Sequence, residues 1–322
     1  MRFGLANPLR MFAAIVLLLG GSHSSHAFRA PSQNNVQNNH PSAVFNAGTT
    51  LVLIPVTITD PSNRFVLGLR KEDFHVFEDG AEQTIANFSG EDAPLSLGLV
   101  FDCSGSMDDK LRLSRIAAAQ FLKTMNVQDE AFLVEFSDSA QLEVEFTSKF
   151  EQLQDKLVAM QPGGLTAMLD ATGMALREMK KAKNPRKAIL IISDGGDNHS
   201  KYSAHELESL VREADVQIYA MGVFEPSIRL GMSNEEVSGP RLLSELAEQT
   251  GGRAFGASEP NDLLSVATRI GIELRNQYVL AYSPANKSKD GKYRRVEVKV
   301  TAQPGMPTLK AHWRLGYYAP SQ

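Results

Sequence analysis

The central part of the chain alternates apolar, strand-like runs with amphipathic helical segments. Leu95 to Phe101 is an uninterrupted apolar run typical of a buried strand, and the segment 110–125 gathers apolar residues four apart on one helical face. Further strands are expected at 131–136, 188–192, 216–223 and 253–256, and further helices at 167–182, 203–214, 240–250 and 260–275. Such alternation predicts an α/β domain at 94–275, with a Rossmann-like, doubly wound, mostly parallel sheet covered by helices on both faces.

Two β-rich segments flank this domain. The first, 47–93, contains two expected strands joined by Asp79-Gly80, a dipeptide that favours a hairpin turn. The second, 276–322, contains a stretch in which valines alternate with charged residues, as on a half-exposed antiparallel sheet. The strands are expected at 51–58, 74–77, 83–88, 277–282, 293–300 and 309–318. Because each set is too small for a core of its own, we expect both to combine into one β-sandwich-like module.

The N-terminus has the pattern of an export signal. Arg2 and Arg10 precede an apolar run that is much shorter than the about 20 residues of a membrane-spanning helix, and Ser25-His26-Ala27 resembles a cleavage site. We therefore expect a signal peptide at 1–27 and a flexible Asn- and Ser-rich leader at 28–46. The mature protein is expected to be soluble in the periplasm or outside the cell, with no later membrane span.

Composition excludes little else. The net charge of -4 is too small to indicate binding to nucleic acid or to an anionic membrane, and a hydrophobic content of 43% is ordinary for a globular protein. Cys103 is the only cysteine, so no disulfide can form within one chain. We interpret it as a small residue packed beneath a loop.

Oxygen-bearing side chains follow expected strands in the central domain and precede one of its helices. The first loop is Asp102-Cys-Ser104-Gly-Ser106, the second contains Thr166, and the third begins at Ser193-Asp194. Ligands of doubly wound sheets bind at the carboxyl ends of the strands. We therefore expect Asp102, Ser104, Ser106, Thr166 and Asp194 to lie together.

Carboxylate and hydroxyl oxygens are hard ligands that suit Mg²⁺ first, with Ca²⁺ and Mn²⁺ as alternatives. Two carboxylates at most neutralise a divalent ion, and the other ligands are neutral. Such an ion keeps an open position that an Asp or Glu of a protein partner can fill. Asp197 and Asn198 follow in the third loop, and we favour a role in holding that loop in shape, with a place behind the metal ligands as the alternative.

This set resembles the metal-ion-dependent adhesion site of von Willebrand factor A and integrin I domains, residue by residue. Nearly all of the mature chain is also similar to a secreted bacterial subfamily of this domain, through Gly68 to Phe74, Glu78 to Gly80, Ser193 to Asn198, Gln277-Tyr278 and Gly316 to Tyr318. The resemblance implies fold and metal binding but names no ligand. Cys103 departs mildly from the family, which more often has Thr, Val or another small residue there.

Other classes of function are weighed against this hypothesis. A hydrolase with Ser104 or Ser106 as nucleophile would need a base, but no histidine lies nearby in the sequence. A structural or assembly subunit would have no need of all five oxygen ligands. We therefore predict an exported, metal-dependent, adhesion-type protein-binding module and not an enzyme. Its partner, its oligomeric state and any shift of its last helix on ligand binding are left open.

Overall fold

The computed structural model describes residues 51–223, 234–257, 260–303 and 305–321. The expected signal peptide and leader, residues 1–46, lie outside the described residues. Within the described ranges, no helix combines the length and the apolar character required to cross a membrane.

A six-stranded sheet forms the centre of the α/β domain, in the order β10-β9-β8-β5-β6-β7. Every strand pair is parallel except β6 with β7. The strands are β5 (Leu95–Asp102), β6 (Glu130–Phe136), β7 (Ala140–Thr147), β8 (Arg186–Ser193), β9 (Gln217–Val223) and β10 (Ala254–Ala257). All residues of β5 are buried, as its continuous apolar run predicts for a strand covered on both faces.

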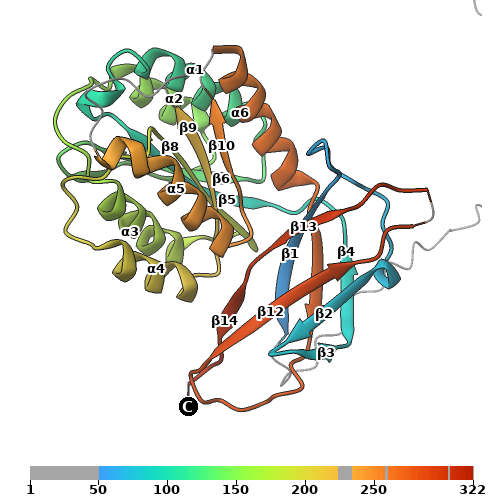
Figure 1. Cartoon of the computed structure of the whole chain (residues 1–322). Helices are drawn as coiled ribbons and strands as arrows, with labels where there is room; N and C mark the ends of the chain where they lie inside the picture. The colour runs from blue at the N-terminus through green and yellow to red at the C-terminus, as the bar shows by residue number, and fades with distance from the viewer. Residues whose placement is uncertain (1–50, 224–233, 258–259, 304, 322) are drawn as a thin grey trace, which may run out of the picture. The chain divides into compact units, whose positions relative to one another are not determined.

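Helices cover both faces of this sheet (Figure 1). One face carries α1 (Leu111–Leu122), α2 (Phe150–Ala159) and α6 (Pro260–Arg275), which pack on Leu97, Leu99 and Phe101 of β5. The other face carries α3 (Met168–Glu178), α4 (Ala204–Glu213) and α5 (Asn234–Gln249), which pack around Val100. Alternate residues of one strand therefore enter different cores. The predicted Rossmann-like fold is confirmed.

Some elements differ from the sequence expectations. Strand β7 and helix α2 were not expected; β7 is a half-exposed edge strand whose apolar pattern is weak. Helix α5 begins at Asn234 and not at residue 240, so Pro240 lies inside it. A proline normally clashes with the Cβ of the preceding residue in a helix, but here that residue is Gly239, which has no Cβ.

Two four-stranded antiparallel sheets form the β-module, in the orders β13-β1-β11-β4 and β14-β12-β2-β3. The strands are β1 (Val52–Thr59), β2 (Phe74–Glu78), β3 (Ala81–Gln83), β4 (Ile85–Ser89), β11 (Tyr278–Tyr282), β12 (Tyr293–Val300), β13 (Lys310–Trp313) and β14 (Gly316–Tyr318). Both sheets mix strands from the two ends of the chain and share one apolar core around Ile54, Val76, Leu280 and Val298. The predicted sandwich-like module is confirmed.

Two of its expected strands are divided. The expected strand 83–88 begins at the last residue of β3, which completes the hairpin with β2, and continues into β4, which pairs with β11 in the other sheet. The segment 309–318 likewise becomes β13 beside β1 and β14 beside β12. Each division lets a continuous run of residues supply both layers of the sandwich, which a local pattern does not reveal.

Candidate metal centre

The ends of β5 and β8 meet where the direction of the sheet order reverses. From β5 the chain proceeds to β6 and β7 on one side, then returns to β8 on the other side and continues to β9 and β10. A topological switch point of this kind is where doubly wound sheets bind their ligands. Asp102 is the last residue of β5, and Asp194 follows the last residue of β8.

Asp102 is a fully buried carboxylate held by two hydrogen bonds. Its Oδ1 accepts from the backbone N of Ser104 at 2.8 Å, and its Oδ2 accepts from the Oγ of Ser193 at 2.6 Å. Burial is the main cause, and repulsion from Asp194 the second, of a pKa of Asp102 that is raised to about 6. Asp194 is thus close enough to disfavour the charged form of Asp102.

The first loop presents two hydroxyl groups together. The Oγ atoms of Ser104 and Ser106 lie 3.1 Å apart. Ser106 lies in a short 3-10 turn, Gly105–Met107, and the buried Met107 anchors this turn in the core beneath. The alternation of residues in the sequence therefore brings the two hydroxyls to one place, as expected from their spacing.

Backbone hydrogen bonds join the second loop to the first. Gly105 N donates to Gly164 O at 3.1 Å, and Gly163 N donates to Cys103 O at 2.8 Å. Gly164 has a φ of +79°, and a Cβ there would meet the carboxylate of Asp138 at 2.6 Å. The second loop therefore needs glycine at position 164 to pass beside Asp138, and Thr166 follows two residues later.

Thr166 is nearly buried, and its backbone is fixed by the third loop. Its N donates to the Oδ1 of Asn198 at 2.9 Å, and its O accepts from the N of Asn198 at 3.0 Å. Asp197 accepts from Leu169 N at 2.8 Å and so satisfies a free donor at the start of α3. Both residues therefore tie the second and third loops together, and any role beside a metal stays a prediction.

Asp194 has a partner that the sequence analysis missed. It is only 6% exposed, and the Nζ of Lys110 lies 2.9 Å from its Oδ2. Ser193, also missed, donates to Asp102 and accepts from Gly195 N at 2.9 Å. Adjacency to Asp194 was a signal for Ser193. For Lys110 the signal was a cation at a helix N-terminus, where the helix dipole disfavours positive charge.

The third loop packs directly on the backbone of α5. Gly195 has a φ of +85°, and a Cβ there would lie 2.6 Å from the carbonyl carbon of Gly239. A Cβ on Gly239 would in turn lie 2.8 Å from the backbone O of Asp194. The backbones of the third loop and α5 can approach this closely only because both contact residues are glycines. The position of Asp194 therefore depends on α5 as well as on β8.

The lone thiol lies beneath the first loop. Cys103 is buried in the core formed with Phe101 and Met107. Burial, with a contribution from Glu135, raises the pKa of this thiol well above its usual value, so it stays protonated. This environment agrees with the interpretation of Cys103 as a packing residue.

The donor set fits a hard divalent cation. Two carboxylates and the serine hydroxyls converge at one sheet edge, and oxygen atoms of these kinds are the ligands of Mg²⁺ and Ca²⁺. Among the described residues, no group of three or more His, Cys, Asp or Glu side chains could hold a metal ion. A carboxylate-rich or zinc-type site is therefore not found in that part of the chain, whereas a site completed by hydroxyls remains.

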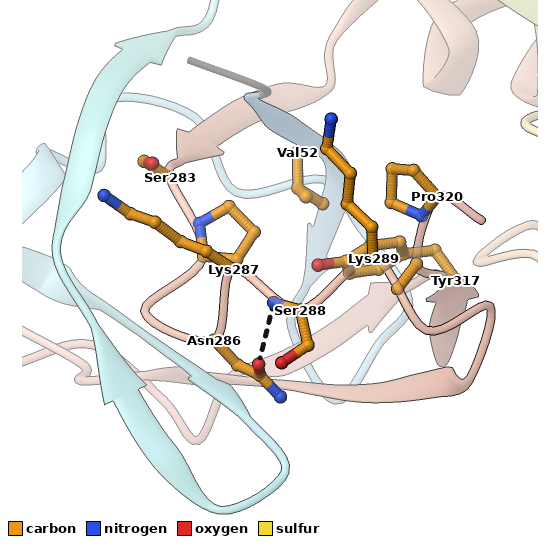
Figure 2. Close-up of a pocket in the computed structure, with 10 residues that line it drawn as sticks. Val52, Ser283, Asn286, Lys287, Ser288, Lys289, Tyr317 and Pro320 are labelled. Carbon is orange, nitrogen blue, oxygen red and sulfur yellow. Dashed lines mark hydrogen bonds between the residues drawn. The ribbon is translucent and has the colours of Figure 1, made fainter. Parts of the chain in front are cut away.

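A cavity of about 240 Å³ lies in the β-module, away from these residues (Figure 2). Its rim includes the loop that follows β11, where Asn286 Oδ1 accepts from Ser288 N at 3.1 Å. Its lining is Val52, Ser283, Pro284, Asn286, Lys287, Ser288, Lys289, Tyr317, Ala319 and Pro320, and it includes none of the five candidate ligands. The exposed lysines and serines of this loop form no cluster that indicates a particular ligand.

Residues 97–196 match the family described as von Willebrand factor type A domain. The match contains the carboxylates and hydroxyls described above. The central domain is a von Willebrand factor type A domain. A solved von Willebrand factor type A structure from Catenulispora acidiphila supports this fold: it is 13% identical, covers 85% of this chain and 74% of its own, and has a TM-score of 0.50.

Other proteins are similar to this von Willebrand factor A domain at lower coverage. The vWF domain of the type V pili tip protein Mfa5 from Porphyromonas gingivalis is 14% identical, with 57% of this chain and 97% of that chain covered and a TM-score of 0.46. An uncharacterized protein of Borreliella burgdorferi is 24% identical over 182 residues, which are 50% of this chain. The match spans 53% of that curated relative's length. Membership in the secreted bacterial subfamily stays a prediction.

Proposed function

We propose that this protein is an exported, metal-dependent binding module. Its von Willebrand factor A domain holds a divalent cation through Asp102, Ser104, Ser106, Thr166 and Asp194, and it engages an acidic residue of a protein partner. Mg²⁺ is the proposed ion, with Ca²⁺ and Mn²⁺ as alternatives. The proposed location is the periplasm or the cell exterior, on the strength of the N-terminal sequence.

One observation carries the metal proposal: two buried carboxylates oppose each other at the switch point of the sheet. Asp102 has no ion pair among the described residues, and burial, together with the nearby charge of Asp194, raises the pKa of Asp102. Burying like charges side by side is costly unless a cation compensates them. A divalent cation would supply that compensation, together with an electrophilic centre for a partner's carboxylate.

The protein groups prepare this position in distinct ways. Ser193 and the backbone of Ser104 orient the carboxylate of Asp102, while backbone hydrogen bonds join Gly163 and Gly164, which precede Thr166, to the first loop. Because the loops are fixed by hydrogen bonds, little ordering is needed when an ion or a partner binds. A preformed, partly neutral site of this kind suits reversible recognition of an acidic side chain.

The decisive experiment is a calorimetric titration of Mg²⁺, Ca²⁺ and Mn²⁺ into the purified protein and into Asp102→Asn. The wild type is expected to bind one ion with weak to moderate affinity, because few ligands are charged. The variant is expected to show no binding heat. Asp108→Asn is the matched control, since Asp108 is exposed in the same loop and should leave the affinity unchanged. Absence of binding in the wild type would contradict the proposal.

The partner proposal needs its own measurement. Peptides that carry a single Asp or Glu should bind in Mg²⁺ and dissociate in EDTA, and their Asn or Gln counterparts should not bind. Association that persists in EDTA would instead favour a structural subunit. An interaction module is also favoured over a hydrolase because the hydroxyls of Ser104 and Ser106 are hydrogen-bonded to each other. Hydrolysis of an ester or phosphoester that Ser104→Ala abolishes would overturn this preference.

A further inference from the structure

Lys110 occupies a position that helix formation does not explain. It is the N-cap residue of α1, yet its side chain makes no capping hydrogen bond. Helix N-termini carry a partial positive charge and favour Asp, Asn, Ser or Thr there, so a lysine is doubly unsuited. The reason for this cation must be sought outside the helix.

The side chain of Lys110 turns into the candidate metal centre. It is only 18% exposed, and its Nζ contacts the Oδ2 of Asp194, which lies 84 residues away in the sequence. A lysine ordinarily keeps its ammonium group in water, because burying it is costly. Asp194 is the partner that offsets this cost.

The backbone of Lys110 is fixed by hydrogen bonds, so its side chain starts from a defined place within reach of Asp194. Lys110 N donates to Met107 O at 2.9 Å, and Ser114 donates to the carbonyl of Lys110 through both its N and its Oγ at 3.0 Å. The same short segment carries Ser104 and Ser106. The lysine is therefore part of the loop that would receive the ion.

An ammonium group and a divalent ion compete for this carboxylate. The Nζ lies 2.9 Å from Asp194 Oδ2, and Mg²⁺ lies about 2.1 Å from its ligand oxygens. Both bound to that oxygen would stand at most about 5 Å apart, where a single and a double positive charge repel each other strongly in a partly buried site. Simultaneous occupation of the oxygen is thus disfavoured.

We infer that Lys110 is a tethered cation. It neutralises Asp194 in the metal-free protein, and a divalent ion that binds to Asp194 Oδ2 displaces its ammonium group. This inference rests on the proposed function. The lysine lowers the affinity of the site, so half-saturation of the centre requires a higher concentration of metal. Without metal, the lysine stabilises a loop that would otherwise hold two uncompensated carboxylates.

The test compares Lys110→Met with the wild type by calorimetric titration of Mg²⁺ and Ca²⁺. Loss of the competing charge is expected to lower the Kd about tenfold, the size of a partly buried ion pair. Lys110→Arg keeps the charge and should keep the weak affinity. Lys123→Met is the matched control, because Lys123 is exposed at the other end of α1 and its loss changes the net charge equally.

A second measurement follows stability and does not depend on a partner. In EDTA, Lys110→Met should unfold at a lower temperature than the wild type, because Asp194 loses its counter-charge. Saturating Mg²⁺ should raise the Tm of this variant more than that of the wild type. Lys110→Gln repeats both measurements if the methionine variant does not fold.

The outcomes separate the two proposals. If the wild type binds metal and Lys110→Met binds it equally or more weakly, the tethered-cation inference is wrong and the metal site stands. If neither protein binds metal, the proposed function fails and the inference fails with it. Tighter binding by Lys110→Met alone, with Lys123→Met unchanged, supports both.

Discussion

The two ends of strand β5 bury carboxylates in opposite ways. Where the strand begins, Asp129 accepts from the backbone N of Leu95 at 2.8 Å and from the N of Asn126 at 2.6 Å, and it forms an ion pair with Arg275. Where the strand ends, Asp102 lies near the carboxylate of Asp194 and has no ion pair among the described residues, while Lys110 pairs with Asp194. At one end of β5 the buried carboxylate is thus balanced by a positive charge, whereas at the other end the negative charge is only partly balanced.

The difference in charge balance distinguishes a structural carboxylate from one that is suited to bind a cation. A carboxylate with both oxygens hydrogen-bonded and a guanidinium beside it has no need of a further cation. Two opposed carboxylates with a single positive charge have an unfilled electrostatic requirement, which a divalent ion can meet. Burial of acidic residues is therefore uninformative alone; the balance of charge around them indicates which edge binds.

The largest effect is expected from neutralising one carboxylate at each end of β5. In EDTA at neutral pH, Asp129→Asn should lower the free energy of unfolding by about 3 kcal/mol, because it leaves the half-buried Arg275 with only the more exposed Asp92. Asp102→Asn should lower it by less, about 1 kcal/mol, because the lost repulsion from Asp194 offsets part of the cost of an amide that can accept only one of the bonds from Ser104 N and Ser193 Oγ. Urea denaturation measures both. A comparable loss in Asp102→Asn would show that Asp102 is structural.

A smaller effect is expected where α5 contacts the third loop. Gly239→Ala places a Cβ against the backbone of Asp194 and Gly195, which should cost about 1–3 kcal/mol of stability and weaken Mg²⁺ binding about tenfold. Gly80→Ala is the control: Gly80 has a φ of +85° in the β2–β3 turn, with no other atom within 4 Å of the added Cβ. It should cost about 1 kcal/mol and leave metal affinity unchanged. Equal metal affinity in both variants would contradict the role of α5.

The smallest expected effect lies in the β-module and concerns pH. Burial, with Arg253 and Lys310 nearby, lowers the pKa of His312 to about 4. The unfolded chain therefore takes up this proton first, near pH 6.5, so stability is complete above that pH and falls as the pH decreases toward 4. At pH 5 the wild type should have lost about 1 kcal/mol relative to His312→Gln, after allowance for partial exposure. Parallel urea curves at pH 7 and pH 5 test this, and identical pH dependence of the two proteins would exclude it.

The alternation of the sequence was sufficient for the fold class. The apolar run of β5 and the spaced apolar residues of α1 each depend on burial of a local segment, so their pattern is visible in the chain itself. Edge strand β7 was missed because half-exposed positions carry little pattern. The divided segments of the sandwich were missed because pairing partners lie far away in the sequence.

Residue types and their order along the chain determined the candidate ligands, because a hard cation needs oxygen atoms and strand ends supply them at one edge. Only the tertiary structure decided which charges surround those ligands. Lys110 meets Asp194, Ser193 meets Asp102 and Gly195 meets Gly239 across separations that no local pattern records. The pattern of apolar residues within each segment indicates which of its faces is buried. Charges are compensated only when segments that are distant in the sequence come into contact in the fold.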